Sequence, residues 1–409
     1  MEWLWPQRGP EGPIGVPSIQ FAAPVRIRPG MTTGWENVDL NQAVLDTAKA
    51  LIEIPSVSAD NNAEVIDFLA DRAAGQGWVT ERLTYRDVED VQKHCLVARA
   101  GQGTGGVAFL SHTDTVPGLE EWEPFVARVA DGRLYGRGSC DMKGPIAAFV
   151  CAVSDIPAAQ LRSPVYMTFS ADEEVGHVGA AWIIEHSELL AGASVEGGIV
   201  TEPTGMVPVY ANKGGAFMAV TSRGIAAHSS TERGDSANFK IAPFLAEMAE
   251  LKTRFMTDPK FRNEEFDPPT NGFNMTITDF GCATNVTAER CECKLSVRSM
   301  PESGFEEAVA IIIERAKVYG FDLRNHEIPY FYGNKDSGFT DLLCEIAGIA
   351  EAVTVPYGTE AAHYQPVVDS IVWGPGDIAQ AHTVNEFIEL EQLQAGYEQY
   401  GELVRRLCL

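Results

Sequence analysis

Apolar and polar residues follow two different spacings along the chain, and each spacing predicts its own kind of element. Apolar residues at helical spacing predict helices over about 41–54, 63–74, 145–153 and 179–186. Short apolar runs predict strands over about 78–85, 95–99, 107–111, 165–170 and 198–201. Strands that alternate with helices favour an α/β sheet that is covered by helices on both faces.

After Lys213 the pattern changes to that of a smaller α+β unit. Strand, helix, strand, strand, helix and strand patterns follow in turn, over about 216–223, 236–255, 274–280, 290–297, 304–319 and 321–325. This β-α-β-β-α-β order is that of a ferredoxin-like unit. The α/β pattern then resumes, with a strand at 370–373 and a helix over about 391–407. We therefore predict one domain made of residues 32–211 and 326–409, interrupted by a second domain at 212–325.

Composition and charge narrow the class of protein. Of the 409 residues, 45% are hydrophobic and 22% are charged, as in globular proteins, and no apolar run reaches the roughly 18 residues of a membrane span. The 31 basic and 57 acidic residues give a net charge of −26, which disfavours nucleic acid and anionic membranes as partners. The eight cysteines show no paired CxxC spacing, which argues against a thiolate zinc site and favours a reducing cytoplasm. Residues 1–31 contain six prolines and no basic segment followed by an apolar run, so we predict an irregular extension rather than a signal peptide.

Five segments place a histidine or a carboxylate at the end of a predicted strand or in a neighbouring loop. They are Ser111-His112-Thr113-Asp114, the glycine-rich run around Asp141, Asp172-Glu173-Glu174, Thr201-Glu202 and Gln380-Ala381-His382. Each alone also fits an ordinary role, such as a structural histidine, a helix N-cap or a solvated acidic loop. The carboxyl edge of an open α/β sheet is, however, where sites form, so the five segments are expected to meet there.

Together these segments can supply a site for two metal ions. The candidate ligands are His112, Asp141, Glu174, Glu202 and His382. If Asp141 bridges, each metal receives the bridge, one histidine and one glutamate. The positive charge of two divalent ions then balances the negative charge of three carboxylates and a hydroxide. Without metal the carboxylates repel one another. Nitrogen and oxygen ligands without thiolate suit Zn, Co or Mn, and we expect Zn.

The ordered motifs resemble those of the M20 metallopeptidases. The segments concerned read SHTDTVPG, YGRGSCDMKG, SADEEVG, TEPTG, AAHSS and GPGDIAQAH, and the resemblance spans about 40–409. It implies a zinc-exopeptidase-like catalytic domain with a mixed, mostly parallel sheet and an inserted ferredoxin-like lid. It assigns His112, Asp141 and Glu202 to one metal, and Asp141, Glu174 and His382 to the other. It also implies a cis peptide bond between Asp141 and Met142.

The resemblance further implies roles for residues around the metals. Glu173 takes the place of the general base, and Asp114 that of the carboxylate that orients His112. His228 matches a lid histidine that stabilises the oxyanion and that relatives often supply from the neighbouring subunit.

Substrate contacts are implied in the lid and in the second half of the catalytic domain. Asn285 and Arg298 match lid residues that hold a substrate carboxylate, and Gly358 and Thr359 are expected to contribute backbone contacts. The chain departs from the family pattern at Ser296, where relatives often carry Asp, and at Thr287, where they often carry Pro.

The expected activity is hydrolysis of the amide bond of an N-acyl amino acid, with N-acetylornithine as the leading substrate and a homodimer formed through the lid. A carboxypeptidase or dipeptidase, and an amidase acting on a non-peptide aromatic amide or amine, are alternative activities. A metal-dependent binding protein without catalysis is the alternative from another class. Retention of Glu173 and of every expected metal ligand argues against it.

Overall fold

The computed structural model describes residues 40–118 and 122–409. The proline-rich extension predicted at 1–31 lies outside the described residues. Among the described helices, none is long and apolar enough to cross a membrane.

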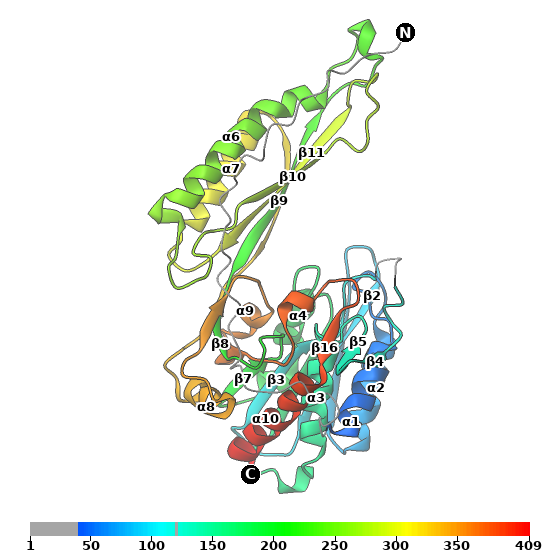
Figure 1. The fold of residues 1–409 in the computed structure, drawn as a ribbon, viewed down its shortest axis with the longest axis vertical. Helices are drawn as coiled ribbons and strands as arrows, with labels where there is room; N and C mark the ends of the chain where they lie inside the picture. The colour runs from blue at the N-terminus through cyan, green and yellow to red at the C-terminus, as the bar shows by residue number, and fades with distance from the viewer. Residues whose placement is uncertain (1–39, 119–121) are drawn as a thin grey trace. The chain divides into compact units, whose positions relative to one another are not determined.

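A nine-stranded mixed sheet forms the larger part of the molecule (Figure 1). Its strands are, in sheet order, β1 (Val79–Arg86), β2 (Gln92–Ala100), β6 (Val165–Ser170), β3 (Val107–His112), β7 (Gly197–Val200), β15 (Ser370–Val372), β8 (Val209–Asn212) and β13 (Phe331–Tyr332), with β14 (Val353–Val355) paired to β8. The central strands β6, β3, β7 and β15 are parallel, whereas β1, β2, β8 and β13 pair antiparallel to their neighbours on this path. The mixed sheet with a parallel centre confirms the predicted α/β class.

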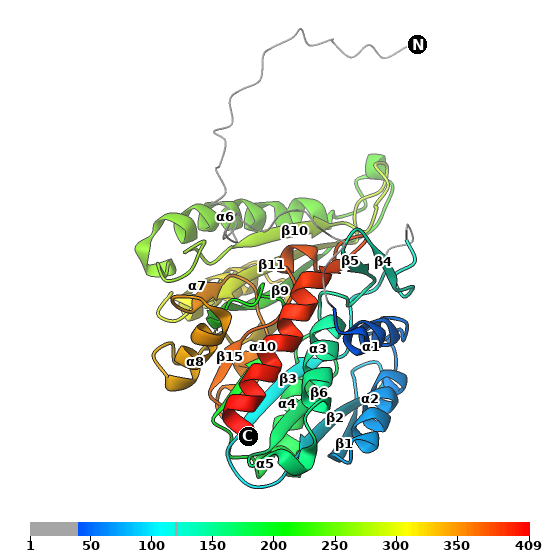
Figure 2. The ribbon, with the colours of Figure 1, turned by 60° about the horizontal axis from the view of Figure 1, so that its bottom comes forward.

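Helices cover both faces of this sheet because its central strands are apolar on both sides. In β3, Phe109 packs into a cluster with α1 (Gln42–Ile52), α2 (Ala63–Gly75), α3 (Lys143–Ser154) and α10 (Leu390–Cys408). The next residue, Leu110, packs on the opposite face with α4 (Val178–His186), α5 (Glu188–Ala191) and α9 (Ala361–Tyr364). Successive side chains of a strand point to opposite faces, so a continuous apolar run serves two cores. Figure 2 shows α1, α2, α3 and α10 on the same face of the strands.

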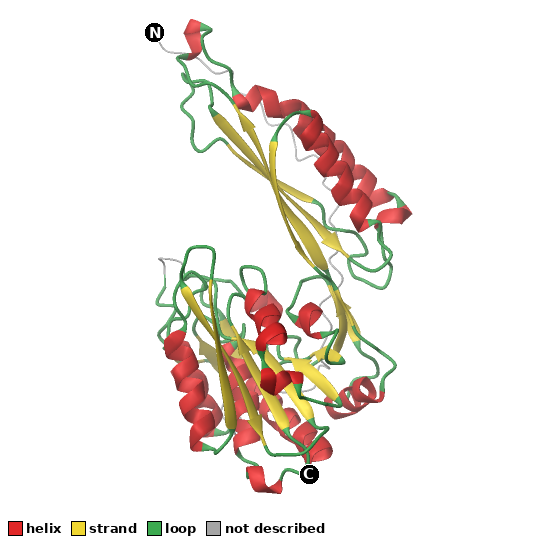
Figure 3. Cartoon of the chain, turned by 180° about the vertical axis from the view of Figure 1, so that it is seen from behind, coloured by secondary structure: helices red, strands yellow, loops and turns green. Residues whose placement is uncertain are grey.

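A second, four-stranded antiparallel sheet carries two long helices on one face (Figure 3). The strand order is β10 (Asn274–Thr278), β11 (Arg290–Ser299), β9 (Gly214–Arg223) and β12 (Asp322–Ile328). Met218 and Val220 of β9 pack against α6 (Ala237–Thr257) and α7 (Phe305–Val318). The element order is the predicted β-α-β-β-α-β, and the sheet order is that of the ferredoxin-like unit. The last strand runs to Ile328, beyond the predicted domain boundary at 325. We call this unit, residues 214–328, the lid.

Several short elements were not predicted from the sequence. A three-stranded sheet is formed by β4 (Arg128–Ala130), β5 (Arg133–Tyr135) and β16 (Phe387–Glu389). The strands β8, β13 and β14 and the helices α5, α8 (Gly338–Ala347) and α9 were also missed. Most of these elements have four residues or fewer, too few to show a periodic pattern.

Candidate metal centre

The carboxyl edge of the large sheet gathers the side chains that the sequence singled out. One of these residues is the last of β3, and one lies just before α3. Two follow β6, one follows β7, and the last lies before β16. In chain order they are His112, Asp141, Glu173, Glu174, Glu202 and His382. Since β6, β3 and β7 are parallel neighbours, their carboxyl ends bring four of these six side chains to one place.

Asp141 lies between two histidines and turns one carboxylate oxygen to each. Its Oδ1 is 3.0 Å from His112 Nε2, and its Oδ2 is 3.3 Å from His382 Nε2. This is the arrangement that a bridging carboxylate requires. The peptide bond between Asp141 and Met142 is cis, as the family resemblance implies.

A glutamate accompanies each histidine. Glu202 Oε1 is 3.3 Å from His112 Nε2, and Glu174 Oε2 is 2.9 Å from His382 Nε2. Asp141, Glu174 and His382 offer three ligand atoms within 4.8 Å of one another, as do His112, Glu202 and Glu173. The imidazole and carboxylate donors fit divalent ions of the zinc, cobalt and manganese type. Glu173 therefore lies directly beside the candidate ligand atoms of His112 and Glu202.

The electrostatics of the cluster also fit a cation site. Burial and the charge of Asp141 raise the pKa of Glu202 well above its usual range and that of Glu174 to about 7. Hydrogen bonds to Asp141 and Glu174 raise the pKa of His382 to about 10. For His112, burial alone would lower the pKa, but the surrounding carboxylates raise it well above its usual value. A cluster of carboxylates and imidazoles that holds protons this tightly is also suited to hold divalent cations.

Asp114 connects one metal ligand to the loop that carries the general base candidate. Its Oδ1 accepts the backbone N–H of Glu173 at 3.1 Å and lies 3.6 Å from His112 Nδ1. Its Oδ2 accepts a hydrogen bond from Ser58 Oγ at 2.7 Å and the N–H of Glu174 at 3.3 Å. The carboxylate therefore holds the loop after β6, while the backbone carbonyl of Asp114 lies 3.1 Å from His112 Nδ1 and orients that ring.

A cavity of about 500 Å³ opens over the candidate metal ligands, and the lid supplies part of its wall. Of the predicted substrate residues, Arg298 and Gly358 line it. Thr359 lies behind this wall, fully buried, with its hydroxyl donating to Asn212 Oδ1 at 2.8 Å. Its side chain thus holds the backbone at Gly358 in place.

His228 and Asn285 lie next to each other on the lid but do not line this cavity. The N–H of Ser229 donates to the Asn285 carbonyl at 2.9 Å, and His228 pairs with Val286 in an isolated bridge. Both side chains are exposed, and His228 Nδ1 accepts a hydrogen bond from Ser230. The structure therefore brings these two predicted residues together, but apart from the metal ligands of their own chain.

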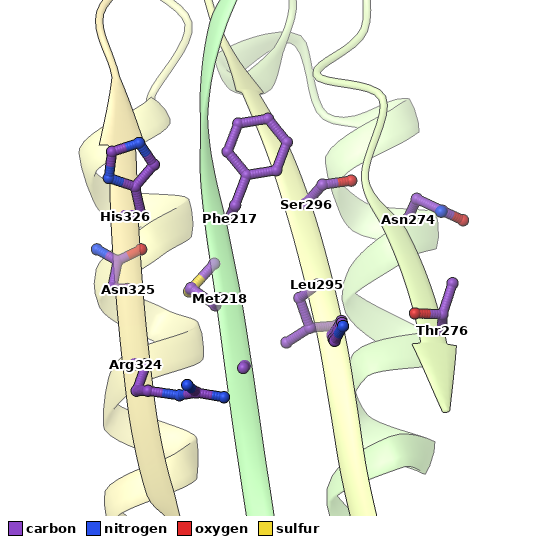
Figure 4. Close-up of a pocket in the computed structure, with 11 residues that line it drawn as sticks. Phe217, Met218, Asn274, Thr276, Leu295, Ser296, Arg324, Asn325 and His326 are labelled. Carbon is purple, nitrogen blue, oxygen red and sulfur yellow. The ribbon is translucent and has the colours of Figure 1, made fainter. Parts of the chain in front are cut away.

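The lid face opposite its helices carries a groove of about 430 Å³ (Figure 4). Phe217 and His326 stand at one end of this groove and also line the cavity over the metals. Ser296, where relatives often carry Asp, lies in the groove, so this departure changes the surface that continues the cavity.

The sequence interpretation missed several residues at the cavity. They are His177, Phe217, His326 and Tyr357. His177 could have been noticed because it follows Glu173 by four residues, whereas nothing in the local pattern marks the other three.

The fold and the site define a metal-dependent hydrolase with a mixed α/β sheet and an inserted α+β unit. The model of the peptidase family M20/M25/M40 matches residues 108–406, and the chain belongs to that family.

Similar proteins agree with this membership. The chain is 30% identical over 383 residues to an acetylornithine deacetylase of Proteus mirabilis, covering 89% of this chain and 97% of the relative. The M20 metallo-carboxypeptidase Sso-CP2 of Sulfolobus solfataricus has a similar structure, with a TM-score of 0.68, 16% identity and coverage of 89% and 99% of the two chains. The YXEP protein of Bacillus subtilis, described as a dinuclear metal binding peptidase of the M20 family, gives a TM-score of 0.56 at 18% identity, with 88% and 96% covered.

Proposed function

We propose that the protein hydrolyses the amide bond of small N-acyl amino acids at a centre of two divalent metal ions. The observation that carries this proposal is the position of Asp141, whose two oxygens face His112 and His382 separately. Similarity to an acetylornithine deacetylase supports an acyl amino acid as substrate, with N-acetylornithine first among them.

The ligand roles follow from the contacts. His112, Glu202 and Asp141 would hold one ion, and Asp141, Glu174 and His382 the other. We propose Zn for both ions, with Co or Mn as possible replacements. Bound ions of this kind lower the pKa of a coordinated water toward about 7 and polarise a carbonyl oxygen.

Residues of this chain supply the remaining chemistry. Glu173, beside the ligand atoms of His112 and Glu202, accepts the proton of the attacking water and delivers it to the leaving amine. Arg298 lines the same cavity and can bind a substrate carboxylate in a bidentate manner. The backbone at Gly358, supported by Thr359, contacts the substrate.

We further propose that His228 and Asn285 act in the site of a neighbouring subunit within a homodimer formed through the lid. Their separation from the metal ligands of their own chain supports this role. The eight cysteines, all free of disulfides, support a cytoplasmic location.

The proposal is tested by amine release from N-acetylornithine, other N-acetyl amino acids, dipeptides and an aromatic amide. Protein loaded with Zn²⁺ or Co²⁺ should release amine at about 1–1000 s⁻¹ from at least one N-acetyl amino acid, and chelated protein should not. Glu173→Gln should bind metal normally and lose at least about 100-fold in kcat, because the base is gone. Cleavage of dipeptides alone would favour a dipeptidase, and no cleavage of any amide would overturn the proposal.

A further inference from the structure

His177 lies directly behind the proposed general base and is almost fully buried. It is the residue before α4, four residues after Glu173, and only 5% of its surface is exposed. Its backbone N–H donates to the Glu173 carbonyl at 3.1 Å, which closes the loop between β6 and α4 into a turn. The ring is therefore held on the same turn as the base.

The side chain of His177 reaches the reactive end of Glu173. His177 Nε2 is 3.1 Å from Glu173 Oε1. A carboxylate only accepts hydrogen bonds, so this contact places a proton on Nε2 and makes the ring the donor. The other ring nitrogen, Nδ1, is buried and has no hydrogen-bond partner among the described residues. Glu173 Oε1 is thus the one described side-chain acceptor for this ring.

Packing keeps the ring in this orientation. The ring of His363, on α9, meets the ring of His177 edge to face, with centroids 5.5 Å apart and planes at 78°. The two histidines come from elements that pack on the same face of the sheet. This contact therefore limits rotation of the His177 ring away from Glu173.

We propose that His177 is a positioning residue, whose Nε2–H holds the Glu173 carboxylate in the orientation needed for proton transfer. This rests on the proposed role of Glu173 as the base. A general base must lie within about 2.6–3.2 Å of the heavy atom whose proton it takes, and a free glutamate side chain can rotate out of that range. Groups that orient an active residue in this way typically contribute about 10–100-fold to activity.

The experiment compares two substitutions of His177 by an amide residue. They differ in which ring nitrogen of histidine the side-chain N–H₂ group replaces. In His177→Gln the side-chain N–H₂ can reach the position of Nε2, whereas in His177→Asn it reaches only the position of Nδ1. His177→Gln should keep kcat within about threefold of wild type, and His177→Asn should lower kcat by about 10–100-fold with KM within threefold. Both variants should retain the metal content and the melting temperature of the wild type. The control is His186→Gln, an exposed histidine at the end of the same helix, and it should match the wild type.

Each outcome decides a separate question. Equal kcat in the Gln and Asn variants, whether both are high or both are low, overturns the positioning role. Parallel losses of kcat, metal and melting temperature in the Asn variant mark a structural residue and overturn it as well. If the metal-loaded wild type cleaves no amide, the proposed function itself fails and the role of His177 fails with it.

Discussion

At the scale of single residues, buried carboxylates at the sheet edge serve several partners at once. Asp141 faces two histidines with its two oxygens, and Asp114 accepts hydrogen bonds from two backbone N–H groups and a serine hydroxyl. A carboxylate has about four lone-pair sites, so it can accept from more donors than an amide, whose oxygen has two. Replacement of either residue is therefore expected to disturb more than one element.

Glu360 is a buried carboxyl group that the proposed reaction does not use. It is fully buried, accepts a hydrogen bond from Ser170 Oγ at 2.6 Å, and leaves its other oxygen without a partner in the described residues. Burial raises its pKa from the usual 4.5 to about 7. The folded protein therefore keeps this proton at pH values where the unfolded chain has lost it.

This difference predicts a pH dependence of stability. Because the folded state binds more protons between about pH 4.5 and 7, the free energy of unfolding contributed by Glu360 falls as pH rises through that range. Glu360→Gln removes the effect, so the stability of wild type relative to this variant should fall by up to about 3 kcal/mol from pH 4 to pH 8. Urea unfolding of both proteins in chelator measures the difference. A difference that stays constant with pH would contradict the prediction, and exposed Glu398→Gln is the control.

Residue types at strand ends were enough to predict that these histidine and carboxylate side chains meet, because side chains that follow parallel strands converge on one edge. The contact of His177 with Glu173 could not be predicted in this way. It depends on a left-handed backbone at His177, with φ of 60°, and on packing against α9, which is distant in the sequence. Likewise, no local pattern shows that Thr359 is buried behind the cavity wall.

At the scale of elements, the start of α4 holds the loop that carries Glu173 and Glu174. The N–H of Gly179 donates to the Ala171 carbonyl at 3.0 Å. A Cβ at Gly179 would lie 2.2 Å from that carbonyl oxygen and 2.5 Å from the Ala171 nitrogen. The helix can approach the end of β6 this closely only because residue 179 has no side chain.

Gly179→Ala should therefore displace the loop after β6. We expect a loss of about 1–3 kcal/mol in the free energy of unfolding and reduced metal binding, because the clash is with backbone that cannot rotate away. Gly338→Ala is the matched control, since Gly338 begins α8 and a Cβ there would meet no atom within 4 Å. The Gly338→Ala variant should have an unchanged free energy of unfolding or one raised by up to about 1 kcal/mol. Denaturant unfolding and metal analysis of both variants test this, and equal stability of the two would disprove the close approach.

Long elements were predictable, and short ones were not. The helix expected at about 391–407 is α10, Leu390–Cys408, and the strand expected at 165–170 is β6 with the same bounds. In both, the apolar pattern is long enough to define a period. By contrast, β16 has three residues and exists because it pairs with β5, more than 250 positions earlier in the chain. Such pairing is set by tertiary structure rather than by local sequence.

At the scale of the whole molecule, two sheets contribute to one cavity. The large sheet supplies the metal ligands at its carboxyl edge, and the lid adds Phe217, Arg298 and His326. Phe217 and His326 also begin the groove on the lid, so the cavity continues along the free face of the second sheet. In the proposed reaction the chemistry depends on the geometry of one sheet edge, while the lid surface offers positions that can contact the substrate.

The central claim is that Asp141 joins two metal sites in one chain. The most direct test is the metal content of each protein after loading with Zn²⁺ and removal of excess ion, determined by elemental analysis. Wild type should retain two ions per chain, and His382→Ala, which loses a ligand of one ion, should retain one. Asp141→Asn should lose both, because the bridge serves each ion. Retention of two ions by Asp141→Asn, or of fewer than two by the wild type, would contradict the account.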